Sequence, residues 1–253
     1  MFDDASLYEQ PAPLSNEWGH HRIYAPQAYP NIRCALTLPL IMEEAATVAQ
    51  QFPICWRREG ADVRLVALIH MLMPEKRHLA PMLSSYPLIG QAYPFVVPDE
   101  TMIERKLVVF DRSLADNPTD IGAPLILSTG RLSKASIIRA KTALQLGRAM
   151  AGTERLSREL HAAGFLEPWP LNFDLGHGVA FERSDLLVLS AKALADPALF
   201  SFVESYGVEA GLFLAFHRIS LFRASQLLTQ AKRAVAAAAR VGRLARAEEV
   251  LGA

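Results

Sequence analysis

The sequence has few cysteines and lacks the short motifs that hold a metal or a phosphate. Its two cysteines, Cys34 and Cys55, cannot make a disulfide framework or a four-cysteine zinc site. One bridge between them stays open, although two reduced thiols in a reducing compartment are the simpler interpretation. There is no Cys-x2-Cys pair, no His-x3-His pair with an intervening glutamate and no glycine-rich phosphate loop. We therefore expect neither a metal centre nor a cofactor.

Long apolar runs and an excess of one charge are absent as well. No stretch reaches the roughly 18 uncharged apolar residues that span a bilayer, because the best one, "GLFLAFHRISLF", is interrupted by His217 and Arg218. The N-terminus, "MFDDASLYEQ", lacks the basic start and apolar run of a secretion signal. Lys+Arg and Asp+Glu both number 26, which argues against nucleic acid as a partner. These absences predict a cytoplasmic protein without a membrane span.

The composition supports one large folded unit with charged ends. Hydrophobic residues make up 51% of the 253 residues, enough for a sizeable core. Residues 1–21 are acidic and contain two prolines, which predicts a flexible arm. Residues 236–253 form a basic, alanine-rich tail, and residues 22–235 are expected to form a single domain. The oppositely charged ends leave a homo-oligomer open, although two solvated ends are the simpler interpretation.

The first half of the chain favours β-strands. "ICWRR" and "VRLVALIHML" flank "EGAD", whose Gly60 suits a turn. Both faces of the second strand are largely apolar, which predicts a central strand covered on both sides. Cys55 on the first strand is then expected to behave as a small apolar group.

The second half favours helices. A helix is predicted over residues 133–164, with Ser133 as its cap and an interruption open at Gly152. Strands follow around the turn "GHG", and then one or two helices with a break open at Gly207. We therefore predict an α+β fold, in which a mainly antiparallel sheet from the N-terminal half packs against a helix-rich C-terminal half.

Two irregular segments are the first places to look for a site, because long loops inside a compact domain are often functional. They are Met73–Pro98 and the polar loop from Asp111 to Gly122. No Gly-x-Ser-x-Gly nucleophile turn is present. The remaining weak candidates for catalysis are Cys55, His70, His78, Tyr93 and His177.

Two basic features have a functional and a plain interpretation. "STGRLSK" precedes a helix N-terminus, whose free N–H groups can bind an anion, although simple capping explains the same residues. The anion candidates there are Ser128, Gly130, Arg131 and Lys134. The adjacent pair His20 and His21 is either a flexible chelate or a solvated pair.

The order of several segments resembles a known family. "RIYAP", "ALTLPLIMEEAATVAQQFPICWRREGADVRLVALIHM", "YPLIGQAYPFVV", "LHAAGFLEPWPLNFDL" and "LFLAFHRISLFRASQLL" follow one another as in the SapC-like family of bacterial surface-layer-associated proteins. The resemblance covers residues 22–230. The sequence departs from the family pattern at "PEKRHLAPMLSSYPLIG", which makes it a divergent member. The resemblance implies no catalytic residues for this sequence, because the family has no defined catalytic residues to match.

Three functions follow as hypotheses. The resemblance implies an accessory protein in surface-layer or surface-protein export or modification, which binds a protein or peptide client. The alternative is an enzyme, a transferase acting on a protein or a small metabolite, with a pocket walled by Met73–Pro98. The third is an assembly scaffold that self-associates through its charged ends.

Overall fold

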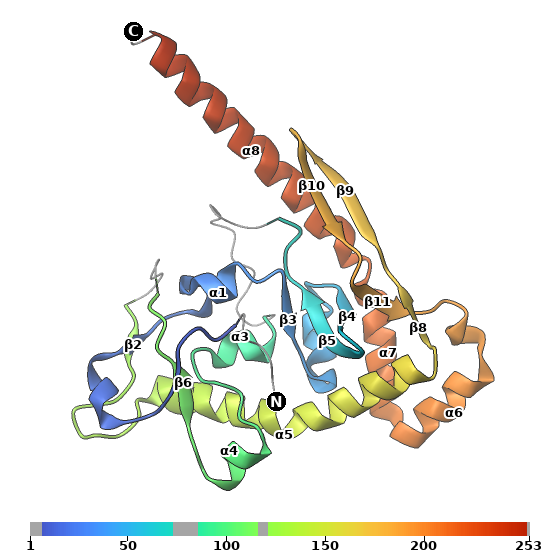
Figure 1. The fold of residues 1–253 in the computed structure, drawn as a ribbon, viewed down its shortest axis with the longest axis horizontal. Coiled ribbons are helices and arrows are strands. Elements are labelled where there is room, and N and C mark those ends of the chain that lie inside the picture. Colours follow the sequence, from blue (N-terminus) through green and yellow to red (C-terminus); the bar gives the residue numbers. More distant parts are fainter. Residues whose placement is uncertain (1–6, 73–85, 116–120, 252–253) are drawn as a thin grey trace.

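The computed structural model describes residues 7–72, 86–115 and 121–251 (Figure 1). The predicted α+β class is confirmed, since antiparallel sheets lie beside helices that dominate the C-terminal half. One long helix, α5 (Lys134–Ala162), runs beneath both parts of the molecule. A lobe built from the N-terminal segment and the described residues between 88 and 124 lies along its first half, and the main sheet lies over its second half. Within the described residues, no helix combines the length and the apolar character needed to cross a membrane.

The main sheet has five strands, and each strand is antiparallel to its neighbours. The sequence-predicted hairpin forms its middle, with Gly60 in the turn at a φ of 66°. In sheet order the strands are β3 (Thr37–Pro39), β5 (Asp62–Leu68), β4 (Ile54–Glu59), β11 (Leu186–Leu189) and β8 (Leu166–Pro168).

Strand β5 is central and covered on both faces, as its sequence predicts. Leu65 and Ala67 belong to the larger core cluster, and Val66 and Leu68 belong to the smaller one on the opposite face. All four are buried. A strand whose two faces are both covered needs apolar residues at every position, which explains the absence of alternation.

The larger core cluster lies between the sheet, α5 and α7 (Val208–Ser220). The Nε1–H of Trp56 on β4 donates to Ser157 Oγ on α5 over 3.0 Å. Helix α5 begins where predicted, because Ser133 Oγ accepts a hydrogen bond from Ser136 N. It continues unbroken through Gly152, so the interruption considered there does not occur.

The smaller core cluster is covered by a hairpin and the last helix, α8 (Arg223–Leu251). The hairpin pairs β9 (Leu171–Gly176) with β10 (Val179–Arg183). The C-terminal region forms three helices rather than one or two. A break at Gly207 separates α6 (Pro197–Tyr206) from α7, and a second break separates α7 from α8. Helix α8 crosses the predicted boundary at residue 235 without interruption and projects beyond the rest of the molecule (Figure 1).

The N-terminal segment is not a free arm over its described residues. Leu7 is buried, and β1 (Pro11–Pro13) pairs with β6 (Val109–Asp111). Residues 7–21 thus make contacts with the fold where the composition predicted a flexible arm, because acidic residues and prolines do not reveal a pairing partner about 100 residues away. The other short elements of this region are β2 (Arg22–Ile23), which pairs with β7 (Ala123–Pro124), and the helices α1 (Pro30–Arg33), α2 (Ala45–Val48), α3 (Leu88–Ala92) and α4 (Glu100–Glu104).

Candidate functional site

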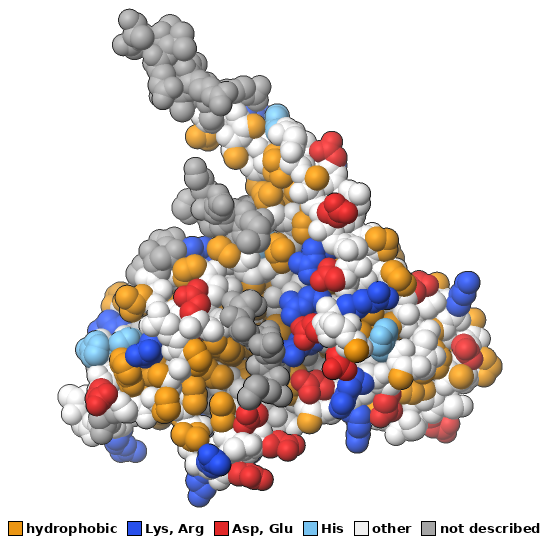
Figure 2. Space-filling view, viewed as in Figure 1, with side chains coloured by type: hydrophobic (Ala, Val, Ile, Leu, Met, Phe, Trp, Pro, Cys, Tyr) orange, Lys and Arg blue, Asp and Glu red, His pale blue; other side chains and the backbone are white. Residues whose placement is uncertain are grey.

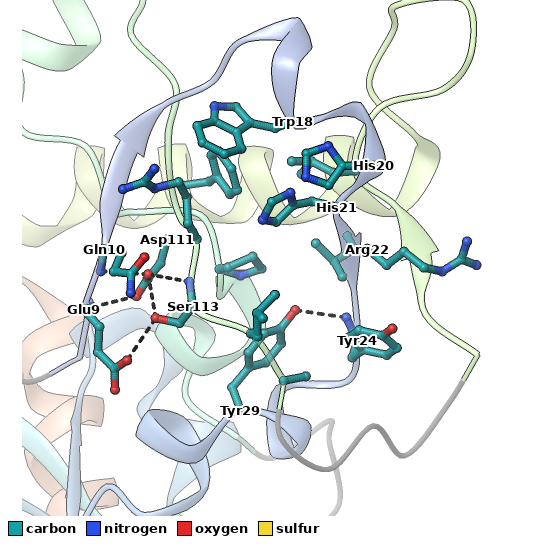
Figure 3. A pocket seen from close by; sticks show the side chains of 17 residues that line it. Glu9, Gln10, Trp18, His20, His21, Arg22, Tyr24, Tyr29, Asp111 and Ser113 are labelled. Carbon is teal, nitrogen blue, oxygen red and sulfur yellow. Dashed lines mark hydrogen bonds between the residues drawn. The ribbon is translucent and has the colours of Figure 1, made fainter.

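A cavity of about 810 Å³ opens between the N-terminal segment and the chain that follows β6. We call it the N-terminal cavity (Figure 3). Three stretches line most of it: residues 9–10, residues 18–24 and residues 110–115. The first and the third are held together by the β1–β6 pair, so the same contact that orders the N-terminal segment also forms the cavity.

The carboxylate of Asp111 organises one wall of the N-terminal cavity. Its side chain is 1% exposed, yet it accepts five hydrogen bonds. The backbone N–H groups of Glu9 and Gln10 donate over 2.8 and 3.0 Å. Ser113 donates through both its backbone N–H and its hydroxyl, and Tyr93 donates through its hydroxyl over 2.9 Å. These donors stabilise the buried Asp111 carboxylate in this position. Its oxygens therefore have little remaining capacity to accept hydrogen bonds from a ligand.

Tyr93 connects Asp111 to the core behind the cavity. Its hydroxyl accepts from Asn31 Nδ2 over 2.8 Å while it donates to Asp111. Burial raises the pKa of the Tyr93 hydroxyl well above its usual range. Arg139 on α5 donates to the carbonyl oxygens of Tyr93 and Tyr24, which ties two sides of the cavity to the long helix. Tyr93 is therefore a neutral structural hydroxyl at physiological pH.

The opposite wall carries aromatic rings and positive charge. The guanidinium of Arg112 lies 5.0 Å from the centre of the Trp18 ring. The centres of the His21 and Trp18 rings are 5.3 Å apart, and the two rings are nearly perpendicular. The centres of the His20 and His21 rings are 4.6 Å apart. Burial lowers the pKa of His21, and the neighbouring His20 and Arg112 lower it further. Because its pKa is below 6.5, His21 is neutral at pH 7 unless an anion approaches.

Two nitrogens of this wall are poorly satisfied. Arg112 Nε and His21 Nδ1 are buried, and neither has a hydrogen-bond partner within the described residues. Arg22 differs, because its side chain turns away from the cavity and donates to the carbonyl of Gly122 over 2.7 Å (Figure 3). Buried polar groups without a partner are uncommon and call for an explanation. Here both lie beside the same open space.

A comparison with protein-family models identifies the family of the chain. A family model described as SapC matches residues 15–199. The chain belongs to the SapC family. The match takes in Trp18, His21 and Asp111 of the N-terminal cavity and ends within α6. No curated protein and no solved structure matches the chain.

The catalytic candidates from the sequence do not gather in this SapC-family fold. Cys55 is buried in the smaller core cluster, and burial raises the pKa of its thiol to about 12, so it carries no thiolate at neutral pH. His70 follows β5, and His177 is exposed at the tip of the β9–β10 hairpin. Tyr93 is engaged behind the cavity, and His78 lies outside the described residues.

The anion candidates lie before and at the start of α5, where the structure shows a side-chain cap. Ser128, Gly130, Arg131 and Lys134 are exposed, and the first turn of α5 is capped by Ser133. Ser136 Oγ in turn donates to Leu125 O over 2.7 Å. Neither Cys34 nor Cys55 forms a disulfide. Among the described residues, no three His, Cys, Asp or Glu side chains come together as a metal-binding group.

The two irregular segments differ in what they contribute. The loop that starts at Asp111 lines the cavity through residues 111–115, and this is a stretch that the sequence singled out without naming individual residues. Of Met73–Pro98, residues 86–98 are described, and only Pro94 of them lines the N-terminal cavity. Trp18 and Arg112 were missed, because a ring and a guanidinium that meet across 94 positions leave no local pattern.

Proposed function

We propose that this SapC-family protein is an accessory binding protein that holds an acidic segment of a client protein in the N-terminal cavity. The observation that carries the proposal is the charge imbalance of the lining. Two arginines, Arg22 and Arg112, line the cavity together with the rings of His20 and His21. Of the lining carboxylates among the described residues, Asp111 is buried and already accepts from five donors. Within the part of the lining that the structure describes, only Glu9 remains to oppose the two arginines.

The aromatic side of the cavity suits a peptide better than a bare anion. Trp18, Tyr24 and Tyr29 line the same space as the cations. Aromatic rings next to arginine contribute most of the affinity in many protein interfaces. A ligand carboxylate would bind the cations, and neighbouring apolar side chains would pack on the rings.

An enzyme remains the second hypothesis, but the lining offers it little support. Ser113 donates to the carboxylates of Asp111 and Glu9 rather than to a histidine. None of Cys55, His70, Tyr93 and His177 lines the N-terminal cavity. The family resemblance supports a client among surface-layer or exported surface proteins, and this proposal includes a cytoplasmic site of action.

Binding of a labelled acidic peptide tests the proposal. We expect a fluorescein-labelled peptide of alternating glutamate and leucine to raise its anisotropy with the protein, and its lysine counterpart to stay unbound. Arg112→Gln should weaken binding about tenfold or more, because a charge-assisted hydrogen bond is lost. Arg105→Gln, an exposed arginine outside the cavity, is the matched control.

The same titration has a characteristic pH dependence. Affinity for the acidic peptide should rise as the pH falls from 7.5 to 5.5, since His21 gains a proton only below its ordinary pKa of 6.5. His21→Gln should flatten this profile. Equal binding of the acidic and basic peptides, or equal effects of Arg112→Gln and Arg105→Gln, would contradict the proposal.

A further inference from the structure

A second cavity, of about 460 Å³, lies between α4, the segment leading into β6 and the first half of α5. We call it the α4–α5 groove. Its wall is largely apolar, and Figure 2 shows hydrophobic side chains gathered over this part of the molecule. The apolar side chains used below are Phe95, Met102, Leu107, Val109, Ile137 and Leu144.

Close backbone contact builds one side of the groove. A Cβ atom at Gly147 of α5 would lie 2.4 Å from the carbonyl oxygen of Pro98, so only glycine allows this approach. Lys106 follows α4 with a positive φ of 54°, a strained conformation for a residue with a side chain. The turn leads into Leu107, which remains 41% exposed beside the groove. An apolar wall is thus held open at the surface.

The charges on the lining are all of one sign. Lys106, Lys141 and Arg148 line the groove, and the lining contains no carboxylate among the described residues. The acidic residues of α4, Glu100 and Glu104, are exposed and lie outside the lining. Lys141 and Arg148 are seven residues apart on α5, so they share one face about 10 Å apart. Their aliphatic stems can lie along the apolar wall while their charges reach water.

We propose that the α4–α5 groove binds a free medium-chain fatty acid. The acyl chain lies against Phe95, Ile137 and Leu144, and the carboxylate meets Lys141 or Arg148. The volume is within the range of small-ligand sites, roughly 300–1,000 Å³. Charge complementarity selects an anionic head group, since an uncharged or cationic amphiphile leaves the lysines and the arginine without a counterion. This site is separate from the N-terminal cavity and does not depend on the proposed client.

Calorimetric titration of the whole chain with octanoate, decanoate and dodecanoate tests the site, below their micelle concentrations. Affinity should rise about three- to fourfold per added methylene until the groove is filled. Dodecanol and dodecyltrimethylammonium should bind at least tenfold more weakly than dodecanoate. Equal binding of dodecanol would overturn the proposal, because the cations would then contribute nothing.

Charge reversal locates the head group. Lys141→Glu combined with Arg148→Glu should weaken dodecanoate binding at least tenfold, whereas Lys134→Glu, exposed on the same helix outside the groove, should leave it unchanged. Ile137→Glu places a carboxylate on the acyl path at a 40% exposed position, so the fold should survive while binding is lost. Circular dichroism confirms folding of each variant.

Two further results distinguish fatty-acid binding in the α4–α5 groove from binding in the N-terminal cavity and from contact with a membrane. Arg112→Gln should leave dodecanoate binding unchanged, so failure of the client proposal would not affect this one. If vesicles of anionic phospholipid capture the chain and dodecanoate does not bind, the groove is a membrane contact and the fatty-acid proposal is wrong. No effect of the double charge reversal would be equally decisive against it.

Discussion

Asp111 and Tyr93 show how single residues take their roles from distant partners. Tyr93 was a candidate for catalysis, but its hydroxyl is held between Asn31 and Asp111. Asp111 received notice only as the first residue of a polar loop, yet it joins Glu9 and Gln10 to β6. Neither role is visible locally, because the donors to Asp111 come from positions up to 102 residues away.

Replacing Asp111 by asparagine should destabilise the protein by about 2–3 kcal/mol. The amide would set an N–H₂ group against N–H and O–H donors that now meet an oxygen. Urea unfolding at pH 7 measures the change. Asp174→Asn is the control, since Asp174 is exposed, accepts from Gly176 N and would keep an oxygen for it. Similar losses for both variants would contradict this account.

At the scale of elements, His217 attaches helix α7 to the sheet. The fully buried ring accepts from Leu189 N of β11 over 3.1 Å, and its Nδ1 lies 2.8 Å from Ile54 O of β4. The neutral ring with a proton on Nδ1 satisfies both contacts. Burial lowers the pKa of His217 to about 3. The sequence showed His217 only as an interruption of an apolar run.

The stability contributed by neutral His217 should be present above pH 6.5 and lost as the pH falls toward 3. At pH 5 the loss is on the order of 2 kcal/mol. His217→Gln should be less stable than the parent at pH 7.5, and the difference in unfolding free energy should shrink by that amount at pH 5. A difference that stays constant with pH would rule out this assignment.

Glu44 changes the stability with pH in the opposite direction to His217. For this reason the test compares the parent protein with His217→Gln at each pH, since the Glu44 effect is the same in both. Its carboxylate accepts from Ile41 N and Leu88 N, but burial raises its pKa to about 7. The folded state therefore holds an extra proton there between pH 4.5 and 7, so this contribution grows as the pH falls. In the parent protein the two effects should therefore oppose each other between pH 5 and 7.

Helix α5 offers a matched pair of glycines. Gly152→Ala should stabilise the protein by about 0.5–1 kcal/mol, because a new Cβ meets nothing within 4 Å and alanine favours helix. Gly147→Ala should destabilise it by about 1–3 kcal/mol, because the new Cβ would lie 2.4 Å from Pro98 O. Thermal unfolding of both variants checks the pair, and a shift of the same sign in both would refute the close contact.

At the scale of the whole molecule, the fold extends beyond the residues that the SapC model matches. That match ends at residue 199, but α7 and α8 complete both core clusters. Leu227, Ala231 and Val235 of α8 are buried beside β9. The helices after residue 199 are therefore part of the folded unit.

Two truncations test this dependence. A chain of residues 1–241 keeps the burial described for α8 and should melt within about 3 °C of the full chain. A chain of residues 1–222 loses the burial of Leu227 and Val235, about 3–6 kcal/mol, and should melt about 6–24 °C lower. Equal melting of the two shortened chains would show that α8 is dispensable.

The sequence by itself determined the α+β class, the central position of β5, the cap at Ser133 and the family. These features depend on hydrophobic periodicity, turn residues and capping, which act over a few neighbouring residues. The apolar faces of β5 and the serine before α5 are signals of this kind.

Only the tertiary structure decided where the N-terminal segment lies and which side chains surround the two cavities. Leu7 packs into the core, the backbone N–H of Glu9 donates to the Asp111 carboxylate, and the Arg112 guanidinium lies over the Trp18 ring, all through contacts between segments far apart in the chain. Acidic residues and prolines predicted an arm because local composition carries no information about a partner strand. Packing and long-range hydrogen bonds determined these contacts, and with them both proposed binding sites.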